Sequence, residues 1–157
     1  MWPFILERSV ALQTHVNATP SEVLQFLQTP EKLCALSPLI KDFSVEGDVV
    51  TVSERLPLLG GLVESSTKFK FKLKVLENGI LCDIYADMWT TMQNHMWTEE
   101  QPDGTTILKE RTCVQALFFF IPYVVATMLA AHIAVMKKIS GTLAEPGQPM
   151  SPVLVRR

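Results

Sequence analysis

Four lysines alternate with apolar residues in the stretch TKFKFKLKV, residues 67–75. A period of two places successive side chains on opposite faces of a β-strand. One face of this strand is therefore charged and wet, while the other face is apolar and carries Phe69, Phe71, Leu73 and Val75. This pattern is typical of an antiparallel sheet with one solvated face, so a second layer has to cover the apolar face.

Two short helices are predicted after a first strand. Residues 6–17 alternate as that strand, and Thr19 and Glu22 then have the spacing of a capping box at a helix N-terminus. Thr29 begins a second helix in the same way, and this helix stops near Pro38. The predicted order up to this point is strand, helix, helix.

Several antiparallel strands follow and lead into one long helix. Turn signals separate the strands: Gly47-Asp48, the Pro/Gly loop at 57–61, Asn78-Gly79 and the PDG turn at 102–104. A further break falls near Asp87-Met88. The last strand runs to about Leu117, and the segment after Phe118 is predicted to be helical.

Residues 112–136 carry no formal charge and are long enough to cross a bilayer. The alternatives are a membrane span or tail anchor, and a buried strand that continues into a buried helix. Pro122 fits the first turn of a helix better than the middle of a span. A helical wheel also gathers large side chains on one broad side: Phe118, Ile121, Val125, Met128, Leu129, His132, Ile133, Met136, Ile139 and Leu143. We therefore favour a helix packed on the sheet, with membrane contact as the less favoured alternative.

Composition indicates one domain with a substantial core. The chain has 157 residues, of which 48% are hydrophobic and 19% are charged. We expect a single domain over residues 1–144 and a disordered tail over residues 145–157, which begins with EPGQPMSP. The net charge of −2 and the absence of a basic run argue against nucleic-acid binding.

The cysteines predict reduced thiols in a cytoplasmic protein. There are three, Cys34, Cys82 and Cys113, and none has C-x-x-C spacing. No Cys/His cluster suggests a metal site, so we expect no metal and no cofactor. The first residues have no basic region of the kind that opens a signal peptide, and oligomeric state cannot be predicted.

The order of these elements resembles the START/Bet v 1-like superfamily, also called the SRPBCC or polyketide cyclase/dehydrase and lipid-transport fold. The segment PSEVLQFLQTPEKLCALSPLIKDFSV is similar to the paired short helices of that fold, LPLLGG and the lysine strand to its middle hairpin, and the helix after ILKERTCVQALFFF to its closing helix. The resemblance covers roughly residues 5–144 and is greatest to small fungal members of unassigned activity. It contains no catalytic signature.

The resemblance implies an α+β helix-grip fold, in which a curved antiparallel sheet wraps around a long C-terminal helix. An apolar cavity between sheet and helix is then expected to hold a small hydrophobic ligand. The residues predicted to line it are Phe69, Phe71, Leu73, Met92, Asn94, Trp97, Val125, Met128, Leu129 and Met136.

Two residues are the main candidates for proton chemistry. His132 lies among methionines and leucine on the apolar helix face, where it is either a hydrogen-bonded core residue or a general acid/base. Glu110 shares the inward face of its strand with Leu108 and Thr112. Either it pairs with a lysine or arginine at the strand end, or its pKa is raised by burial near His132.

The segment MWTTMQNHMW, residues 88–97, is the third candidate. One face would carry Met92 and Asn94, and the other would carry His95 and Trp97. Periodicity does not decide which face points inward, because both faces mix polar and apolar groups. His95 is therefore a third candidate acid/base. Ordinary packing of a half-exposed strand is the alternative.

These observations lead to one functional prediction with a rival. The chain is expected to bind a small, largely apolar molecule and to steer its cyclisation, isomerisation or dehydration without a cofactor. The resemblance implies a polyketide- or terpenoid-like intermediate of fungal secondary metabolism. The rival is a non-catalytic lipid or sterol carrier with the same fold, and a third interpretation is a membrane-anchored interaction protein.

Overall fold

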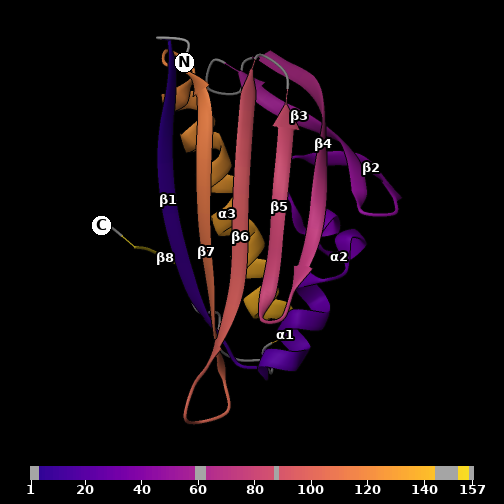
Figure 1. The fold of residues 1–157 in the computed structure, drawn as a ribbon, viewed down its shortest axis with the longest axis vertical. Helices are drawn as coiled ribbons and strands as arrows, with labels where there is room; N and C mark the ends of the chain where they lie inside the picture. The colour runs from indigo at the N-terminus through magenta and orange to yellow at the C-terminus, as the bar shows by residue number, and fades with distance from the viewer. Residues whose placement is uncertain (1–3, 59–62, 87–88, 144–151, 156–157) are drawn as a thin grey trace.

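A computed structural model describes residues 4–58, 63–86, 89–143 and 152–155 (Figure 1). Within these ranges, eight strands form one sheet, and three helices accompany it. The strands are β1 (Ile5–Val16), β2 (Ile40–Glu46), β3 (Val49–Leu58), β4 (Val63–Leu76), β5 (Gly79–Ala86), β6 (Thr90–Glu100), β7 (Thr106–Leu117) and β8 (Val153–Leu154). The helices are α1 (Pro20–Leu27), α2 (Pro30–Leu36) and α3 (Ile121–Leu143).

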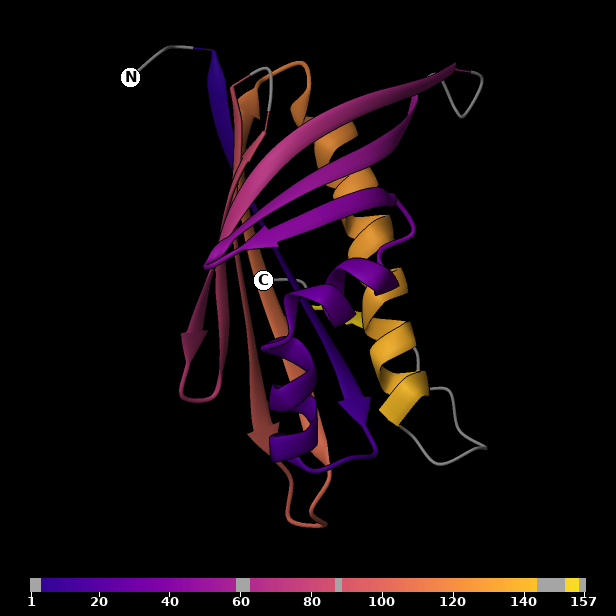
Figure 2. The ribbon, with the colours of Figure 1, turned by 90° about the vertical axis from the view of Figure 1, so that its right-hand side faces the viewer.

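The sheet is antiparallel and curved, with strand order β2-β3-β4-β5-β6-β7-β1-β8. Figure 2 shows α3 lying across the inner face, with β2, β3 and β4 curving toward it. In the same view, α1 and α2 lie between the lower part of the sheet and α3. The predicted helix-grip α+β fold, with two short helices after the first strand, is confirmed.

Strand β4 contains the lysine alternation and has the two faces that the sequence predicts. Its four lysines are exposed, whereas Phe71 is only 8% exposed and Phe69 and Leu73 pack against the core. Val75 is the exception, at 55% exposed, where β4 extends toward the β4–β5 turn. The apolar face of β4 is therefore covered over most of its length.

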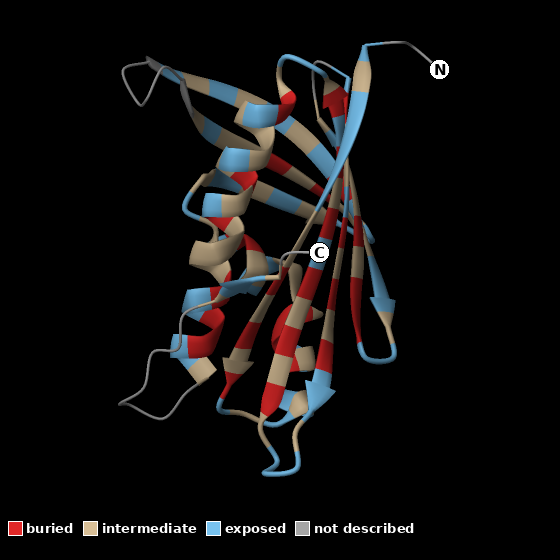
Figure 3. Cartoon of the chain, turned by 90° about the vertical axis from the view of Figure 1, so that its left-hand side faces the viewer, coloured by how far each residue is buried: buried red, intermediate tan, exposed pale blue. Residues whose placement is uncertain are grey.

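Helix α3 packs mainly against β1 and β7, and Met128, Met136 and Ile139 are buried. Figure 3 shows that the long helix carries buried, intermediate and exposed segments. The wheel is wrong at Phe118, which is 51% exposed and precedes the helix. The helix begins at Ile121 because Pro122, with its fixed φ and missing N–H, belongs in the first turn. Residues 112–136 are thus the end of a strand followed by a helix, as favoured from the sequence.

The same helix is the one described segment that is long and apolar enough, by length and composition, to cross a membrane. In this fold 28% of its apolar stretch is buried, and Met128, Met136 and Ile139 are among the buried residues. Length and composition alone do not distinguish these two situations. Within this fold the helix packs on the sheet through its contacts with β1 and β7.

The two short helices start differently. Thr19 accepts a hydrogen bond from the Glu22 backbone N–H, while the Glu22 carboxylate accepts one from the Thr19 backbone N–H at 2.8 Å, so the predicted capping box is confirmed. Thr29 occupies the N-cap position of α2 but makes no side-chain cap bond. Its hydroxyl instead donates to the Gln25 carbonyl at 2.8 Å, which is why the expected cap is absent.

The predicted hairpin at Asn78-Gly79 is present, but the glycine has a different role. β4 ends at Leu76 and β5 begins at Gly79, so Gly79 is a strand residue. A Cβ at this position would lie 2.0 Å from the carbonyl oxygen of Met96 on β6. Close approach of the neighbouring strand, rather than a positive φ, therefore requires glycine here.

The C-terminal segment differs in part from the prediction of a disordered tail over residues 145–157. Val153 and Leu154 form β8, which pairs with Gln13 and Leu12, and the Val155 N–H donates to the Ala11 carbonyl at 2.9 Å. The edge of β1 offers unpaired backbone groups, and β8 satisfies some of them. Residues 145–151 and 156–157 of that tail, residues 59–61 of the predicted loop, and the break at 87–88 lie outside the described residues.

Candidate functional site

A cluster of polar side chains lies between the sheet and α3. Oε1 of Glu110 contacts Nδ1 of His132, and it also accepts hydrogen bonds from Asn94 Nδ2 at 2.6 Å and from the Thr112 hydroxyl at 2.8 Å. Asn94 Nδ2 also donates to Thr112 Oγ1 at 2.8 Å. Three elements, β6, β7 and α3, thus bring their polar groups to a single carboxylate oxygen.

Strand register explains why these residues meet. Asn94 on β6 and Thr112 on β7 are direct cross-strand partners, and both point to the inner face. Glu110 is two residues from Thr112 and therefore shares that face. His132 reaches the carboxylate from the facing side of α3, with Met128 one turn before it and Met136 one turn after it.

This polar cluster separates two apolar clusters of the core. The larger apolar cluster includes Met96, Leu108 and Met136, and the smaller one includes Val114, Met128 and the packed Met92. On β6, β7 and α3 alike, the polar residue stands between a residue of one cluster and a residue of the other. A buried polar layer costs free energy unless it is fully hydrogen-bonded, so its presence has to be explained by specificity or by function.

Electrostatics favour the charged pair. Burial alone would raise the pKa of Glu110, but the charge of His132 and the bonds from His132, Thr112 and Asn94 outweigh it and hold that pKa below 4.5. Burial would lower the pKa of His132, but the charge and hydrogen bond of Glu110 and the charge of Glu54 raise it above 6.5. A carboxylate paired with an imidazolium is therefore the stable state.

Glu110 lies beside His132, as one of the two sequence interpretations expected, but the expected pKa shift and the expected lysine or arginine partner are wrong. The pKa of Glu110 is lowered rather than raised, because the charge of His132 and three hydrogen bonds stabilise the carboxylate. Its partner is a histidine from α3 and not a lysine or arginine at the strand end. The carboxylate side chain is 3% exposed, while the imidazole keeps 24% of its surface accessible. His132 is therefore the member of the pair that another molecule can contact.

Glu54 was missed by the sequence analysis. It follows Val50 and Val52 at intervals of two on β3, and both valines are fully buried, so all three residues share the inner face. Burial raises the pKa of Glu54 to about 7, while the charge of His132 acts in the opposite direction. The alternation in VVTVSERL would have revealed an acid at an inward position.

His95 and Trp97 lie on the opposite face of the sheet from this cluster. β6 alternates, so the inward positions are those of Asn94 and Met96, and His95 pairs across to the exposed Arg111. The His95 and Trp97 rings stack on each other with centroids 4.7 Å apart. The structure therefore does not bring His95 to the other catalytic candidates or Trp97 to the apolar walls, which corrects both placements.

The other predicted ligand-binding residues lie on the inner surfaces. The larger apolar cluster includes five of them: Phe69, Phe71, Leu73, Leu129 and Met136. The smaller apolar cluster includes the other three: Met92, Val125 and Met128. Phe71, Met128 and Met136 are buried by neighbouring side chains. The remaining five keep accessible surface, as His132 does.

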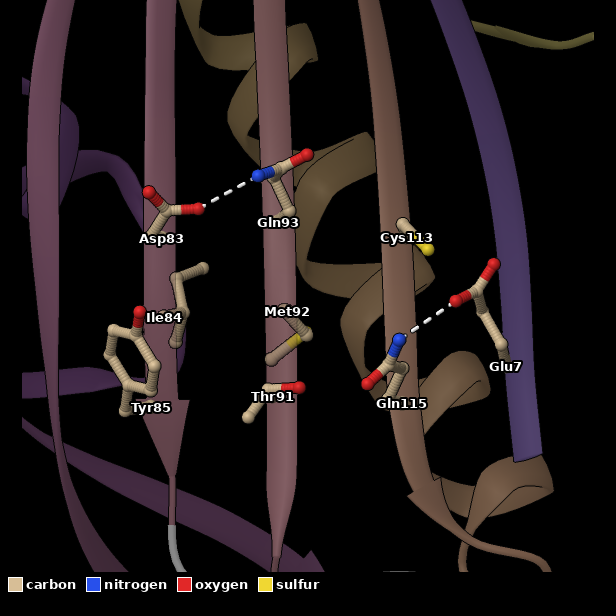
Figure 4. Close-up of a pocket in the computed structure, with 9 residues that line it drawn as sticks. All are labelled: Glu7, Asp83, Ile84, Tyr85, Thr91, Met92, Gln93, Cys113 and Gln115. Atoms are coloured by element: carbon tan, nitrogen blue, oxygen red, sulfur yellow. Dashed lines mark hydrogen bonds between the residues drawn. The ribbon is translucent and has the colours of Figure 1, made fainter. Parts of the chain in front are cut away.

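A concave feature lies on the outer face of the sheet (Figure 4). This groove of about 340 Å³ crosses β5, β6, β7 and β1, with α3 behind the sheet. Its two carboxylates are already bonded: Gln93 donates to Asp83 at 2.9 Å, and Gln115 donates to Glu7 at 2.8 Å. The groove is open and its acids are occupied, so the inner polar cluster is the better candidate site.

The cysteines pack as neutral thiols. Cys34 and Cys82 are buried, and burial raises the pKa of Cys34 to about 11 and that of Cys82 to about 12. Thiols with such pKa values are poor nucleophiles and poor metal ligands at neutral pH. Among the described residues, no three His, Cys, Asp or Glu side chains are grouped so as to hold a metal ion.

Comparison with known proteins identifies the fold. No protein-family model matches the chain, and no curated protein sequence matches it. Among solved structures, it is similar to a START superfamily protein from Mycobacterium smegmatis, with a TM-score of 0.62, 16% identity, and coverage of 89% of this chain and 97% of that one.

Two further solved structures have the same fold. Norcoclaurine synthase from Thalictrum flavum matches with a TM-score of 0.65 and 15% identity over 88% of this chain and 87% of that chain. The di-domain ARO/CYC StfQ from the steffimycin biosynthetic pathway matches with a TM-score of 0.64 and 10% identity over 89% of this chain and 51% of that one. The protein thus has the helix-grip fold that these solved structures share, which is the fold that the sequence resemblance implies.

Proposed function

We propose that this protein binds a small, largely apolar molecule between α3 and the sheet and guides its cyclisation, isomerisation or dehydration by proton transfer. His132 is the group that contacts the ligand, and Glu110 holds its imidazole in place. The resemblance adds a polyketide- or terpenoid-like intermediate of secondary metabolism as the ligand class and the cytoplasm as the location. No cofactor takes part in this scheme.

One observation carries the proposal: a buried carboxylate–imidazole pair lies between two apolar clusters, with the imidazole side left accessible. A pair needed only for stability would be replaceable by apolar side chains at little cost. A pair that moves protons needs a protonated imidazole next to a bound molecule, held in one orientation. The hydrogen bond from Nδ1 to Glu110 leaves Nε2 as the reactive nitrogen.

The names of two structural neighbours support an enzyme. One is described as an ARO/CYC of a biosynthetic pathway and the other as norcoclaurine synthase. Both identities are low, so the comparison supports the capacity of the fold for such chemistry rather than a particular reaction. The START name of a third neighbour favours the rival, a carrier of lipid or sterol that uses the apolar walls without proton transfer.

The binding site is tested with the neutral fluorescent probe N-phenyl-1-naphthylamine. Leu129→Trp adds bulk to a half-buried wall residue on α3 and should abolish binding. Gln93→Trp is the matched control, because it adds the same bulk to the outer groove and should leave binding unchanged. Loss of binding in Gln93→Trp alone would move the site to the outer face.

Enzyme and carrier are separated by His132→Phe, with His95→Phe as the control on the opposite face. Native mass spectrometry of the purified protein first identifies any ligand that copurifies. The enzyme predicts that His132→Phe keeps ligand binding but loses ~10²–10⁴-fold in turnover of that ligand. Equal turnover by His132→Phe and His95→Phe, or no turnover by the wild-type protein, would favour the carrier.

A further inference from the structure

Glu110 fixes the direction of the hydrogen bonds in the polar cluster. Three side chains meet its Oε1, and a carboxylate oxygen only accepts, so each of the three has to donate. Asn94 therefore turns its amide nitrogen toward Glu110, at 2.6 Å. The same nitrogen also donates to Thr112 Oγ1 at 2.8 Å. Both hydrogens of the Asn94 amide are thus used inside the cluster.

This arrangement leaves two polar atoms without a partner among the described residues. One is the amide oxygen of Asn94, Oδ1, because the amide makes its hydrogen bonds through nitrogen. The other is Nε2 of His132, because the imidazole meets Glu110 through Nδ1. Oδ1 is an acceptor, and Nε2 of an imidazolium is a donor. The cluster therefore offers one acceptor and one donor to another molecule.

Both atoms reach accessible surface. Within the described ranges, Nε2 of His95 is the only fully buried side-chain nitrogen or oxygen that lacks a hydrogen bond. Oδ1 of Asn94 and Nε2 of His132 also lack one, so neither of them is fully buried. Asn94 as a whole is only 5% exposed, and an amide oxygen in such a position is costly to leave unpaired.

Resting on the function proposed above, we infer that the ligand carries a hydroxyl group, which accepts a hydrogen bond from His132 Nε2 and donates one to Asn94 Oδ1. A hydroxyl group both donates and accepts, whereas carbonyl and ether oxygens only accept. The two side chains meet at one oxygen of Glu110, which keeps their free polar atoms on one part of the inner surface. The ligand class is therefore an apolar alcohol or phenol.

Asn94 is the residue that selects the hydroxyl group. Glu110 is the other acceptor of the cluster, but its Oε1 already takes three donors and His132 balances its charge. Oδ1 of Asn94 takes none. Leaving a buried acceptor without any donor costs the desolvation free energy of that group. The amide oxygen therefore gains most from the hydrogen of the ligand, and a ligand without that hydrogen binds less tightly.

The test compares three apolar bicyclic compounds that differ in one polar group: 2-decalol, its methyl ether and 2-decalone. The binding of each is measured by displacement of N-phenyl-1-naphthylamine from the full-length protein. The ether and the ketone can accept from His132 but have no hydrogen to donate to Asn94. The alcohol should therefore bind ~10–100-fold more tightly than either of them. Equal affinities for the three compounds would overturn the inference and leave the binding function standing.

Asn94→Ala removes the amide oxygen. Gln93→Ala is the matched control, because Gln93 is the neighbouring amide on the outer face and also donates to a carboxylate, that of Asp83 at 2.9 Å. In Asn94→Ala the alcohol should bind no more tightly than the ether, while Gln93→Ala should keep the full preference for the alcohol. An undiminished preference in Asn94→Ala would assign the hydrogen bond to Glu110 and overturn the role of Asn94.

A measurement on the wild-type protein makes the assignment independent of the stability of Asn94→Ala. The side-chain amide signals of Asn94 in ¹⁵N NMR spectra should shift more with 2-decalol than with its methyl ether, and those of Gln93 should shift with neither. Equal shifts of the Asn94 signals with both compounds would also overturn its role. Failure of the wild-type protein to bind N-phenyl-1-naphthylamine and all three bicyclic compounds would instead contradict the proposed function itself.

Discussion

Glu110 and His132 show how far single residues are predictable from this sequence. Alternation along one strand and the wheel of one helix placed both on the inner faces, since periods of two and 3.6 depend only on local geometry. The sign of the Glu110 pKa shift was wrong because it depends on a contact between residues 22 positions apart. Glu54 was overlooked because it lies between two polar residues of its strand, Ser53 and Arg55, although its spacing from Val52 marks it as inward.

At the residue scale, Glu110→Gln should destabilise the fold by ~3 kcal/mol, because the imidazolium of His132 loses its buried partner. Glu99→Gln is the control: Glu99 accepts from Lys109 at 2.7 Å on the exposed face, and such pairs contribute ~0–1 kcal/mol. Urea denaturation of both variants measures the difference. Similar losses in the two variants would show that the buried pair adds no net stability.

The same pair has a defined pH window. The lowered pKa of Glu110 gives stability that is present above 4.5 and lost as pH falls through the folded value. The raised pKa of His132 gives stability that is present below 6.5 and lost as pH rises through the folded value. The loss of unfolding free energy caused by Glu110→Gln should therefore be largest at pH values between the folded-state pKa of Glu110 and that of His132. It should be smaller at lower and at higher pH.

The contribution of Glu54 to folding stability should change with pH in the opposite direction to that of Glu110. Its pKa is raised to about 7, so the folded state holds a proton that the unfolded state releases above 4.5. This group therefore removes stability as pH rises from 4.5 to about 7. Glu54→Gln should be more stable than wild type above neutral pH, by ~1–3 kcal/mol, and indistinguishable from it in acid. Thermal unfolding across pH measures this, and a uniform shift at all pH values would contradict it.

At the element scale, patterns with a local cause were predicted well. The β4 alternation, the Thr19 capping box and the turn at Gly47, whose φ is +64°, all follow from the residues present. Three features depended on contacts that a pattern does not show. These are the Gln25 bond that diverts Thr29, the β6 backbone that requires Gly79, and the pairing of β8 with β1.

Strand β4 gives the element-scale prediction. Phe71→Asp should destabilise the protein by ~4 kcal/mol or more, because it buries an unpaired charge in the larger apolar cluster. Lys72→Glu, one residue further on the exposed face, should change stability by less than ~0.5 kcal/mol. Chemical denaturation of the two variants measures these changes in unfolding free energy. Equal losses in both variants would show that the two faces of β4 are wrongly assigned.

The whole molecule is held together by the closure of α3 onto the sheet. The overall order of elements was predicted because antiparallel strands, short helices and a final apolar helix leave few ways to cover one large apolar face. The inward face of β6 was not predicted, because it depends on how β6 pairs with its neighbours and on which side of the sheet α3 covers. Deciding between the candidate faces needed the register of β6 with β7.

The closing helix gives a prediction about solubility. Full-length protein should be soluble and monodisperse without detergent, since Met128, Met136 and Ile139 face the core. Deletion of residues 118–143 should leave an insoluble chain, because the inner face of the sheet is then uncovered. Size-exclusion chromatography of both chains checks this. Recovery of the full-length protein only in membrane fractions would contradict the packing of α3 on the sheet.

The central claim is that a ligand contacts His132 between α3 and the sheet, and the chain provides its own controls. It has three histidines, and His15 bonds to Thr105 at 2.7 Å away from the site while His95 stacks on Trp97 on the outer face. Imidazole ¹⁵N spectra recorded during titration with N-phenyl-1-naphthylamine measure all three at once. We predict that the His132 Nε2 signal shifts on binding while those of His15 and His95 stay in place. Saturable binding that leaves His132 unchanged, or that shifts His95 instead, would contradict the claim.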